Sequence, residues 1–216
     1  INEAFDTDAK VLSANELLYA ATLTNDKARQ EAIYKKTTEL YPNDFRAYNN
    51  LGMMAYANGD FTTAENYFKQ AASKDANAPE VNTNLGYIEL VKGNVANAET
   101  YLSKSTGANT ANEALGNLYI KQGQYDRAVQ AFGDTKTNSA ALAQILAKDY
   151  NKAKNTLNAV KNPDAYTDYL MAIVGARTNN ADLVKTSMAK VAQKDATLAA
   201  KAQIDREFAK YANEIK

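Results

Sequence analysis

Three segments of the chain repeat one pattern of apolar, small and polar positions. They cover residues 45–72, 79–106 and 109–132, and they align without gaps. Each has Leu-Gly, a second Gly seven residues later, an Ala five residues after that, and Phe or Leu four residues further on. In the first segment these are Leu51, Gly52, Gly59, Ala64 and Phe68. Apolar and small residues at such intervals predict a pair of α-helices in each segment.

The two glycines of each segment have different predicted roles. The first lies inside a helix, where Gly costs about 0.5–1 kcal/mol relative to Ala, so it predicts a close approach of a second helix. The second follows the last turn of the first helix and predicts a left-handed cap. The predicted contact points are Gly52, Gly86 and Gly116, and the predicted caps are Gly59, Gly93 and Gly123. Asp60 and Asn94 then suit the start of a second helix.

This pattern resembles the tetratricopeptide repeat (TPR). The stretch ALGNLYIKQGQYDRAVQAF matches the family pattern nearly throughout, and the first two segments are 34 residues apart, the typical family period. The resemblance implies an all-α fold: an α-solenoid of antiparallel helix pairs, a TPR superhelix of about five to six repeats, some of them degenerate.

We predict a single TPR-like domain over residues 1–216. Its regular repeats cover 45–132, and degenerate repeats cover 8–44 and 133–196, with a hinge at Asn179 and Asn180. The final segment, 197–216, predicts a C-terminal capping helix, because its apolar residues form one stripe on an otherwise polar helix. The residues of that stripe are Ile204, Phe208, Tyr211 and Ile215.

The family resemblance places a partner-binding groove on the concave face, which the first helix of each repeat lines. Asn side chains would bond an extended peptide backbone, and Met and Tyr would supply apolar contact. The alternative is that these Asn residues only cap or solvate the helices and that the partner uses a less defined or different interface. The predicted partner-binding residues are Arg46, Asn49, Asn50, Met53, Tyr56, Thr83, Asn84, Tyr87, Asn117 and Lys121.

A carboxylate clamp of the kind found in chaperone-binding TPR proteins is not expected. Those members hold a C-terminal carboxylate with Lys and Arg from three successive first helices. Asn50 matches one clamp Asn, but Asn15, Tyr19, Glu80 and Asn84 occupy the other places. A carboxylate facing Glu80 would be disfavoured by charge repulsion.

Composition removes several classes of function. The chain has no Cys and no His, which excludes disulfides, thiolate metal sites and Ser-His-Asp arrangements. Lys plus Arg and Asp plus Glu number 25 each, so there is no basic field to attract nucleic acid. No run approaches the ~20 apolar residues that span a membrane. We therefore expect no enzyme activity, no cofactor and no metal.

The function that the repeat implies is a protein-interaction module or scaffold, with a protein or peptide partner whose identity the sequence does not give. One alternative is a small-ligand-binding or enzymatic role in a pocket near the irregular repeats after residue 133. Another is a purely structural spacer within a longer chain.

The setting of the protein is predicted from the same resemblance. The stretches YPNDFRAYNNLG and PDAYTDYLMAIVGARTNN look like TPR regions of larger bacterial cell-envelope proteins. This implies a periplasmic or outer-membrane-associated protein, with a cytoplasmic one as the alternative. The chain begins at Ile1 rather than Met, which predicts a processed form or a domain of a longer protein.

Overall fold

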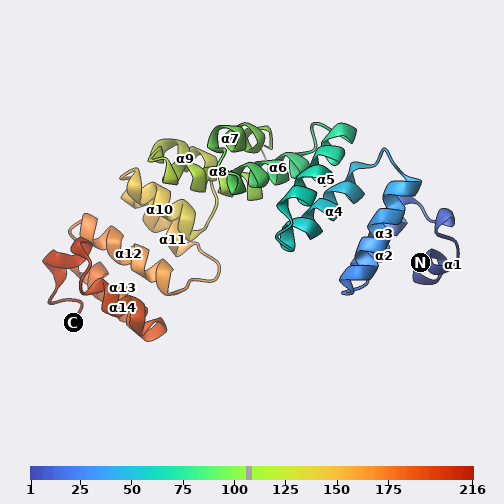
Figure 1. The fold of residues 1–216 in the computed structure, drawn as a ribbon. Coiled ribbons are helices and arrows are strands. Elements are labelled where there is room, and N and C mark those ends of the chain that lie inside the picture. Colours follow the sequence, from blue (N-terminus) through green and yellow to red (C-terminus); the bar gives the residue numbers. More distant parts are fainter. Residues whose placement is uncertain (106–108) are drawn as a thin grey trace. The chain divides into compact units, whose positions relative to one another are not determined.

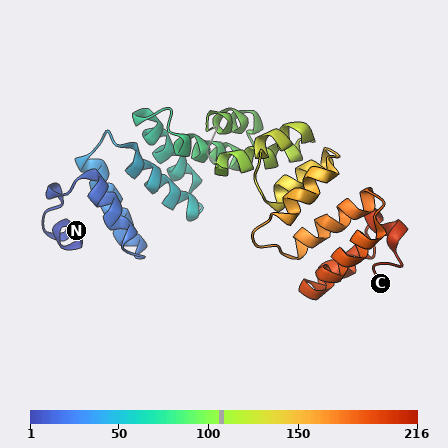
Figure 2. The same cartoon turned by 180° about the vertical axis from the view of Figure 1, so that it is seen from behind.

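The computed structural model describes residues 1–105 and 109–216, and every regular element among them is a helix. Two compact units divide the chain, Ile1–Ala111 and Asn112–Lys216, called here the first and second units. Within each unit, consecutive helices lie side by side as antiparallel pairs (Figures 1 and 2). The predicted all-α class, an array of antiparallel helix pairs, is therefore confirmed. The prediction of one domain over the whole chain stays a prediction.

The first unit holds three helix pairs behind a short N-terminal helix. Short loops join the helices of each pair, which makes the two helices neighbours in space. Its elements are α1 (Asn2–Asp8), the 3-10 turn η1 (Ala9–Val11), α2 (Ala14–Thr22), α3 (Lys27–Leu40), α4 (Phe45–Ala57), α5 (Phe61–Lys74), α6 (Pro79–Val91), α7 (Val95–Lys104) and the first residues of α8 (Asn109–Lys121).

Side-chain caps explain why several of these helices start where they do. Ser13 and Glu16 form a reciprocal capping box at the start of α2, and Asp26 and Asp44 accept backbone N–H groups at the starts of α3 and α4. Asp60 accepts the amide of Thr63 at 3.1 Å, which confirms its predicted role. Such caps stabilise a helix by about 1 kcal/mol each.

The prediction that Asn94 starts a second helix is confirmed, because Asn94 is the N-cap residue of α7. Asn94 lies at the start of α7, but its side chain accepts no backbone N–H there. Its Nδ2 instead donates to the carboxylate of Glu89 at 2.9 Å. This bond joins the start of α7 to α6.

The glycine predictions are confirmed in both units. A Cβ on Gly52 would lie 2.5 Å from Cε1 of Phe68, and the corresponding helix contacts exist at Gly86 and Gly116. The second glycines have φ angles of +77°, +77° and +72° at Gly59, Gly93 and Gly123. The first group therefore permits close helix packing, and the second group ends the first helices.

The second unit contains the rest of α8 and the less regular pairs. Its core is built from successive local clusters, as expected where each pair packs on its neighbours. The elements are α9 (Tyr125–Phe132), α10 (Asn138–Leu146), α11 (Tyr150–Asn158), α12 (Ala165–Arg177), α13 (Ala181–Lys194), α14 (Ala196–Ala202) and the 3-10 segment η2 (Arg206–Tyr211).

A continuous capping helix over 197–216 does not form, and this prediction is corrected. The chain has the short helix α14, a break at Gln203–Asp205, and then η2. Ile204 is 86% exposed, so it does not belong to an apolar stripe, whereas Phe208 and Tyr211 are buried against α12 and α13. The break lets these two aromatic side chains reach the core.

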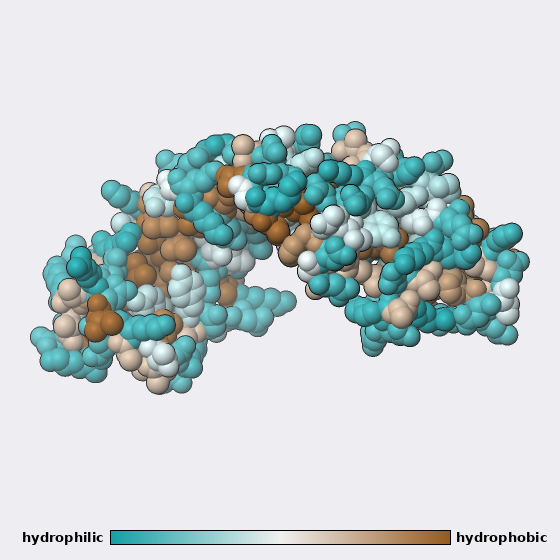
Figure 3. All heavy atoms as spheres, in the orientation of Figure 1, coloured by the Kyte–Doolittle hydropathy of each residue, from teal (hydrophilic) through white to brown (hydrophobic). Residues whose placement is uncertain are grey.

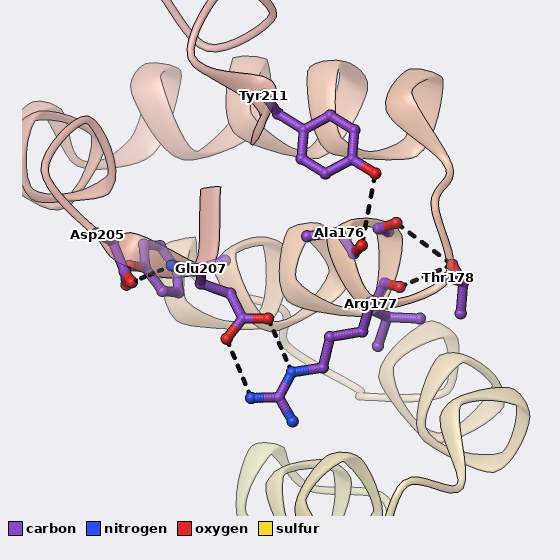
Figure 4. Close-up of polar contacts among 9 residues, drawn as sticks. Ala176, Arg177, Thr178, Asp205, Glu207 and Tyr211 are labelled. Atoms are coloured by element: carbon purple, nitrogen blue, oxygen red, sulfur yellow. Dashed lines mark hydrogen bonds and ion pairs between the residues drawn. The ribbon is translucent and has the colours of Figure 1, made fainter. Parts of the chain in front are cut away.

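Polar contacts hold η2 on α12. Asp205 accepts the amide of Glu207 at 2.9 Å and so starts η2, and its other carboxylate oxygen accepts the hydroxyl of Tyr169. Burial, and then this bond, raises the pKa of Tyr169. Figure 4 shows the Glu207 carboxylate facing Arg177, with N–O distances of 2.8 and 3.0 Å. These contacts attach η2 and the residue before it, Asp205, to α12 at the end of the second unit.

Candidate functional site

The candidate site lies on the first helices of the first unit. Here we call the side chains of α2, α4 and α6 that face away from the second helices the first-helix face. Two hydrogen bonds join its helices, from Arg46 Nη1 to Asn15 Oδ1 and from Asn84 Nδ2 to Asn49 Oδ1, both at 2.9 Å. These bonds show that the three helices present one connected surface.

A small apolar pocket opens on this face between α4 and α6. Its volume is about 280 Å³, and Met53 and Tyr56 of α4 and Asn84 and Tyr87 of α6 line it, with the buried Phe68 of α5 beneath. Met53 is 51% exposed. Figure 3 shows a largely hydrophilic visible surface, with apolar residues near α6 and α8 and a more extensive apolar area at α10. Four of the predicted partner-binding residues thus meet at one pocket.

Amide groups support the pocket from below. Asn49 is only 5% exposed, its Oδ1 accepts from Asn84, and its Nδ2 points at the sulfur of Met53 at 3.8 Å. Asn49 is therefore not available to a partner, and its prediction as a contact residue is corrected. Its position one helical turn before Met53 makes it a support for the two residues that line the pocket.

The two pocket tyrosines are held in place by further contacts. The ring of Tyr56 packs edge-on against Phe61, with centroids 5.1 Å apart and an interplanar angle of 67°. The Tyr87 hydroxyl donates to the carbonyl of Thr110 at 3.4 Å. Because both rings are fixed before any partner arrives, little side-chain freedom is lost on binding.

Arg46 is engaged within the chain. Its Nε donates to both oxygens of Asp44 at 2.9 and 3.2 Å, and these bonds lower the pKa of Asp44 and raise that of Arg46. Asp44 in turn accepts the Arg46 amide and starts α4. The guanidinium therefore mainly binds Asp44 at the start of its own helix, and one further bond joins it to Asn15 of α2.

The other predicted partner-binding residues differ in how far they are exposed. Thr83 is buried and donates its hydroxyl to the Pro79 carbonyl at 2.8 Å, so the prediction that it contacts a partner is wrong. Asn50 is half-buried on α4. Asn117 and Lys121 are exposed on the part of α8 that belongs to the second unit. These last three stay predictions.

Further apolar residues belong with this face by helical period. Tyr19 on α2, Leu23 directly after α2 and Val91 on α6 are large apolar side chains with considerable exposure. Tyr19 follows Asn15 by one helical turn, and Val91 follows Tyr87 by one turn, so each lies on the same side of its helix as that residue. Phe68 was assigned only to the helix seam, because the sequence does not show that its ring also floors a pocket.

Three family models, each of the tetratricopeptide repeat, match residues 33–66, 50–113 and 113–136. The matches run across the segments that carry the six glycines in register, and the described helices pair as that repeat requires. Residues 33–136 of the chain therefore form tetratricopeptide repeats. The predicted family resemblance is thereby confirmed, while the first 32 residues and those after 136 lie outside the matched region.

Solved structures share the TPR fold at low sequence identity. PilF of Pseudomonas aeruginosa matches with a TM-score of 0.73 and 11% identity over 96% of this chain and 100% of its own. PilW, a widely conserved type IV pilus biogenesis factor, matches with a TM-score of 0.63 and 18% identity, over 91% and 97% of the two chains.

A third match is to a larger chain. In the APC/C hetero-tetramer Cut9-Hcn1 the TM-score is 0.67 and the identity 15%, and the match covers 99% of this TPR chain but only 44% of the other. No curated protein sequence matches. At these identities the likeness shows the fold alone.

Among residues 1–105 and 109–216, no group of three or more acidic residues is arranged to hold a metal ion. No helix within those ranges is long and apolar enough to cross a bilayer.

Proposed function

We propose that this TPR chain binds an extended segment of a partner protein on its first-helix face and catalyses no reaction. The observation that carries the proposal is the apolar pocket between α4 and α6. Its volume of about 280 Å³ suits one large apolar side chain of the partner. The pocket is formed by residues that the family pattern assigns to the ligand-facing positions of first helices.

One anchored side chain supplies part of the binding free energy. Burying a Leu, Met or Phe side chain contributes about 1.5–3 kcal/mol. The exposed apolar residues Tyr19, Leu23 and Val91 extend the contact surface over α2 and α6. Together they favour a partner segment with apolar side chains at intervals, rather than a single small molecule.

The Asn84 amide gives the site a polar group beside the pocket. An amide has two N–H donors and one carbonyl acceptor, and Asn84 uses one donor on Asn49. The other donor and the acceptor match the C=O and N–H of an extended peptide backbone, whose polar groups need partners when buried. Asn84 would thus fix the backbone while the pocket holds the side chain.

A setting in the bacterial cell envelope, periplasmic or outer-membrane-associated, is proposed with this function. Its support is the likeness in fold to PilW, which is described as a type IV pilus biogenesis factor. Fractionation of cells that produce the natural protein tests it: recovery with the periplasm or outer membrane is expected, and recovery with the cytoplasm contradicts it.

The binding proposal is tested by selecting ligands from a library of random peptides displayed on phage. Selected peptides are then measured by fluorescence anisotropy against the natural chain and the variant Met53→Lys/Tyr87→Ala. We expect enrichment of a large apolar residue and at least a tenfold weaker Kd for the variant, since it places a charge at the pocket and removes one of its aromatic walls. Val95→Ser, which removes an exposed apolar side chain from α7, is the matched control. Equal Kd values for the chain and the pocket variant would exclude this face.

A further inference from the structure

The three helix pairs of the first unit share one register. Their second helices, α3, α5 and α7, begin after the N-cap residues Asp26, Asp60 and Asn94, each 34 residues after the one before. The pair α2–α3 keeps this spacing, although Leu18 and Asn25 stand where the regular repeats have glycine. Residues that are 34 apart therefore occupy the same place on α2, α4 and α6.

This register gives the first-helix face two rows of apolar side chains, called here the apolar ladder. Each first helix contributes one residue to each row, and the second row follows the first by four residues, or about one helical turn. The first row is Tyr19, Met53 and Tyr87, and the second is Leu23, Ala57 and Val91. Four of the six side chains are between 45% and 56% exposed, so a partner can still cover them. In α8 the corresponding places hold Asn117 and Lys121, so the ladder has three steps.

The distance between neighbouring first helices sets the spacing of a partner's side chains. The bonds Arg46–Asn15 and Asn84–Asn49 show that α4 contacts both α2 and α6. Helices in contact have axes about 8–10 Å apart. In a polyproline II segment, with three residues per turn and a rise of about 3.1 Å, every third side chain returns to the same side after about 9 Å. In a β-strand the third side chain points to the opposite face. One apolar residue in every three of a polyproline II segment therefore matches the ladder.

A row of polar side chains beside the ladder favours the same conformation. It consists of Glu16, Asn50 and Asn84, which are again 34 residues apart and lie about one turn before the first apolar row. A polyproline II backbone has no internal hydrogen bonds, so its N–H and C=O groups are available to these side chains. A partner α-helix bonds its own backbone groups. At about 10–12 Å across, it is also wider than a ladder that spans four helical residues, or about 6 Å, so it would cover the polar row without pairing it.

Charge adds a requirement on the residues between the apolar ones. Residues 1–111 contain 14 Asp and Glu against 10 Lys and Arg, although the whole chain is neutral. Arg46 on α4 and Lys92 at the end of α6 are already paired with carboxylates. Glu16 and Glu80, at the starts of α2 and α6, are exposed and add negative charge. Lys or Arg in the partner therefore complements this face, which speeds the encounter and disfavours acidic partners.

We infer that the partner segment is a basic polyproline II stretch with a large apolar residue at every third position and Pro and Lys or Arg between them. The inference rests on the proposed function, since it uses the same face, and it adds the conformation, spacing and charge of the partner. One apolar side chain of the segment enters the pocket between α4 and α6, and a second lies against Tyr19 and Leu23.

Fluorescence anisotropy of labelled peptides with the full chain tests the spacing. The probe is Leu-Pro-Lys-Leu-Pro-Lys-Leu, and its matched control, Leu-Pro-Leu-Lys-Leu-Pro-Lys, has the same composition with Leu at every second position. We expect the probe to bind at least tenfold more tightly than the control, and at least threefold more tightly than a probe with Glu in place of both Lys. No binding of the probe, equal binding of the control or of the Glu peptide, or equal binding of a helical peptide with Leu at every seventh position overturns the inference.

Variants connect the spacing to the ladder. Tyr19→Ser should weaken binding of the probe at least threefold, while Tyr166→Ser, which removes another exposed tyrosine from α12, should change little. No loss in Tyr19→Ser, or equal losses in the two variants, would contradict the ladder.

The peptides selected from the phage library separate this inference from the proposed function. If they lose affinity for Met53→Lys/Tyr87→Ala but have no apolar residue at every third position, the face binds a partner and only the inferred spacing is wrong. If they bind that variant as tightly as the natural chain, both the proposed function and the inference fail.

Discussion

The helix pairs α4–α5 and α12–α13 have the same lengths, 13 and 14 residues, but place their small residues differently. In α4–α5, Gly52 lies against the ring of Phe68. Counted from the helix starts, Ala172 takes the place of Gly52 in α12, and Met188 takes the place of Phe68 in α13. At this contact α12 therefore has a larger residue than α4, and α13 has a narrower and more flexible side chain than α5.

The glycine of α12–α13 occurs three residues later. Gly175 stands where α4 has Ala55, and its partner Val184 stands where α5 has Ala64. A Cβ on Gly175 would lie 3.0 Å from the Val184 backbone nitrogen and 3.1 Å from its Cγ2. A small residue is therefore required wherever the two helices of a pair come closest, which in α12–α13 is at Gly175 and Val184. A repeat that looks degenerate in sequence can thus keep the same kind of helix packing.

The largest effect is expected from Gly52→Ala. The added methyl would lie 2.5 Å from Cε1 of Phe68, which is buried and has little room to move. Overpacking should exceed the gain in helix propensity, lowering the free energy of unfolding by about 2 kcal/mol. Urea denaturation measures this value.

The double variant Gly52→Ala/Phe68→Met sharpens the comparison, because it recreates the pair found in α12–α13. It should recover more than half of the lost stability. Additive losses from the two changes would show that the two pairs are not equivalent.

Gly175→Ala should have a smaller effect. Its Cβ meets a backbone nitrogen at the limit of normal contact, so α12 and α13 must separate slightly. We expect a loss of about 1–2 kcal/mol in unfolding free energy. Adding Val184→Ala, which recreates the α4–α5 residue, should relieve the contact with Cγ2 but leave the backbone contact. No change in the denaturation midpoint for Gly175→Ala would contradict this account.

A third pair, α6–α7, has Glu89 at the place of Ala55 and Gly175. The buried carboxylate accepts from Asn94 Nδ2 at 2.9 Å, Asn97 Nδ2 at 3.3 Å and Lys92 Nζ at 3.2 Å. These bonds, that of Asn94 first, lower the pKa of Glu89. Glu89→Gln should therefore destabilise the chain by about 1–2 kcal/mol at neutral pH, since the bonds to a charged acceptor are lost.

The pH dependence of this effect follows from the lowered pKa. The contribution of the Glu89 charge is complete above the unfolded value of about 4.3 and is lost as the pH falls through the lower folded value. Melting temperatures of the natural chain and Glu89→Gln should therefore converge as the pH falls from 6 to about 3. A constant difference across that range would exclude the charge as the cause.

The smallest effect concerns the turns between paired helices. Lys148 and Asn179 have φ angles of 65° and 55°, where the regular repeats have glycine. Lys148→Gly should raise the free energy of unfolding by about 0.5–1 kcal/mol, because removing the Cβ relieves strain but increases the freedom of the unfolded chain. Asn179→Gly should gain less, since Asn tolerates this conformation. Thermal denaturation compares the two, and a larger gain at Asn179 would contradict the reasoning.

The candidate site was predicted in part from the sequence. Met53, Tyr56, Asn84 and Tyr87 were assigned to one surface by helical period and family pattern, and they line one pocket. Asn49 and Thr83 were assigned to the same surface but are buried, because neighbouring helices cover them. Period shows which way a side chain leaves its helix, but not how close the next helix comes.

The sequence by itself determined the helix pairs, the glycine contacts and caps, and the family, because these depend on spacing within about one repeat. Tertiary structure alone decided that Ile204 stays exposed while Phe208 and Tyr211 enter the core, and that Asn49 and Thr83 are buried. Each depends on atoms brought together from different helices. The free energy of a buried polar or apolar group is set by those neighbours, which local spacing does not encode.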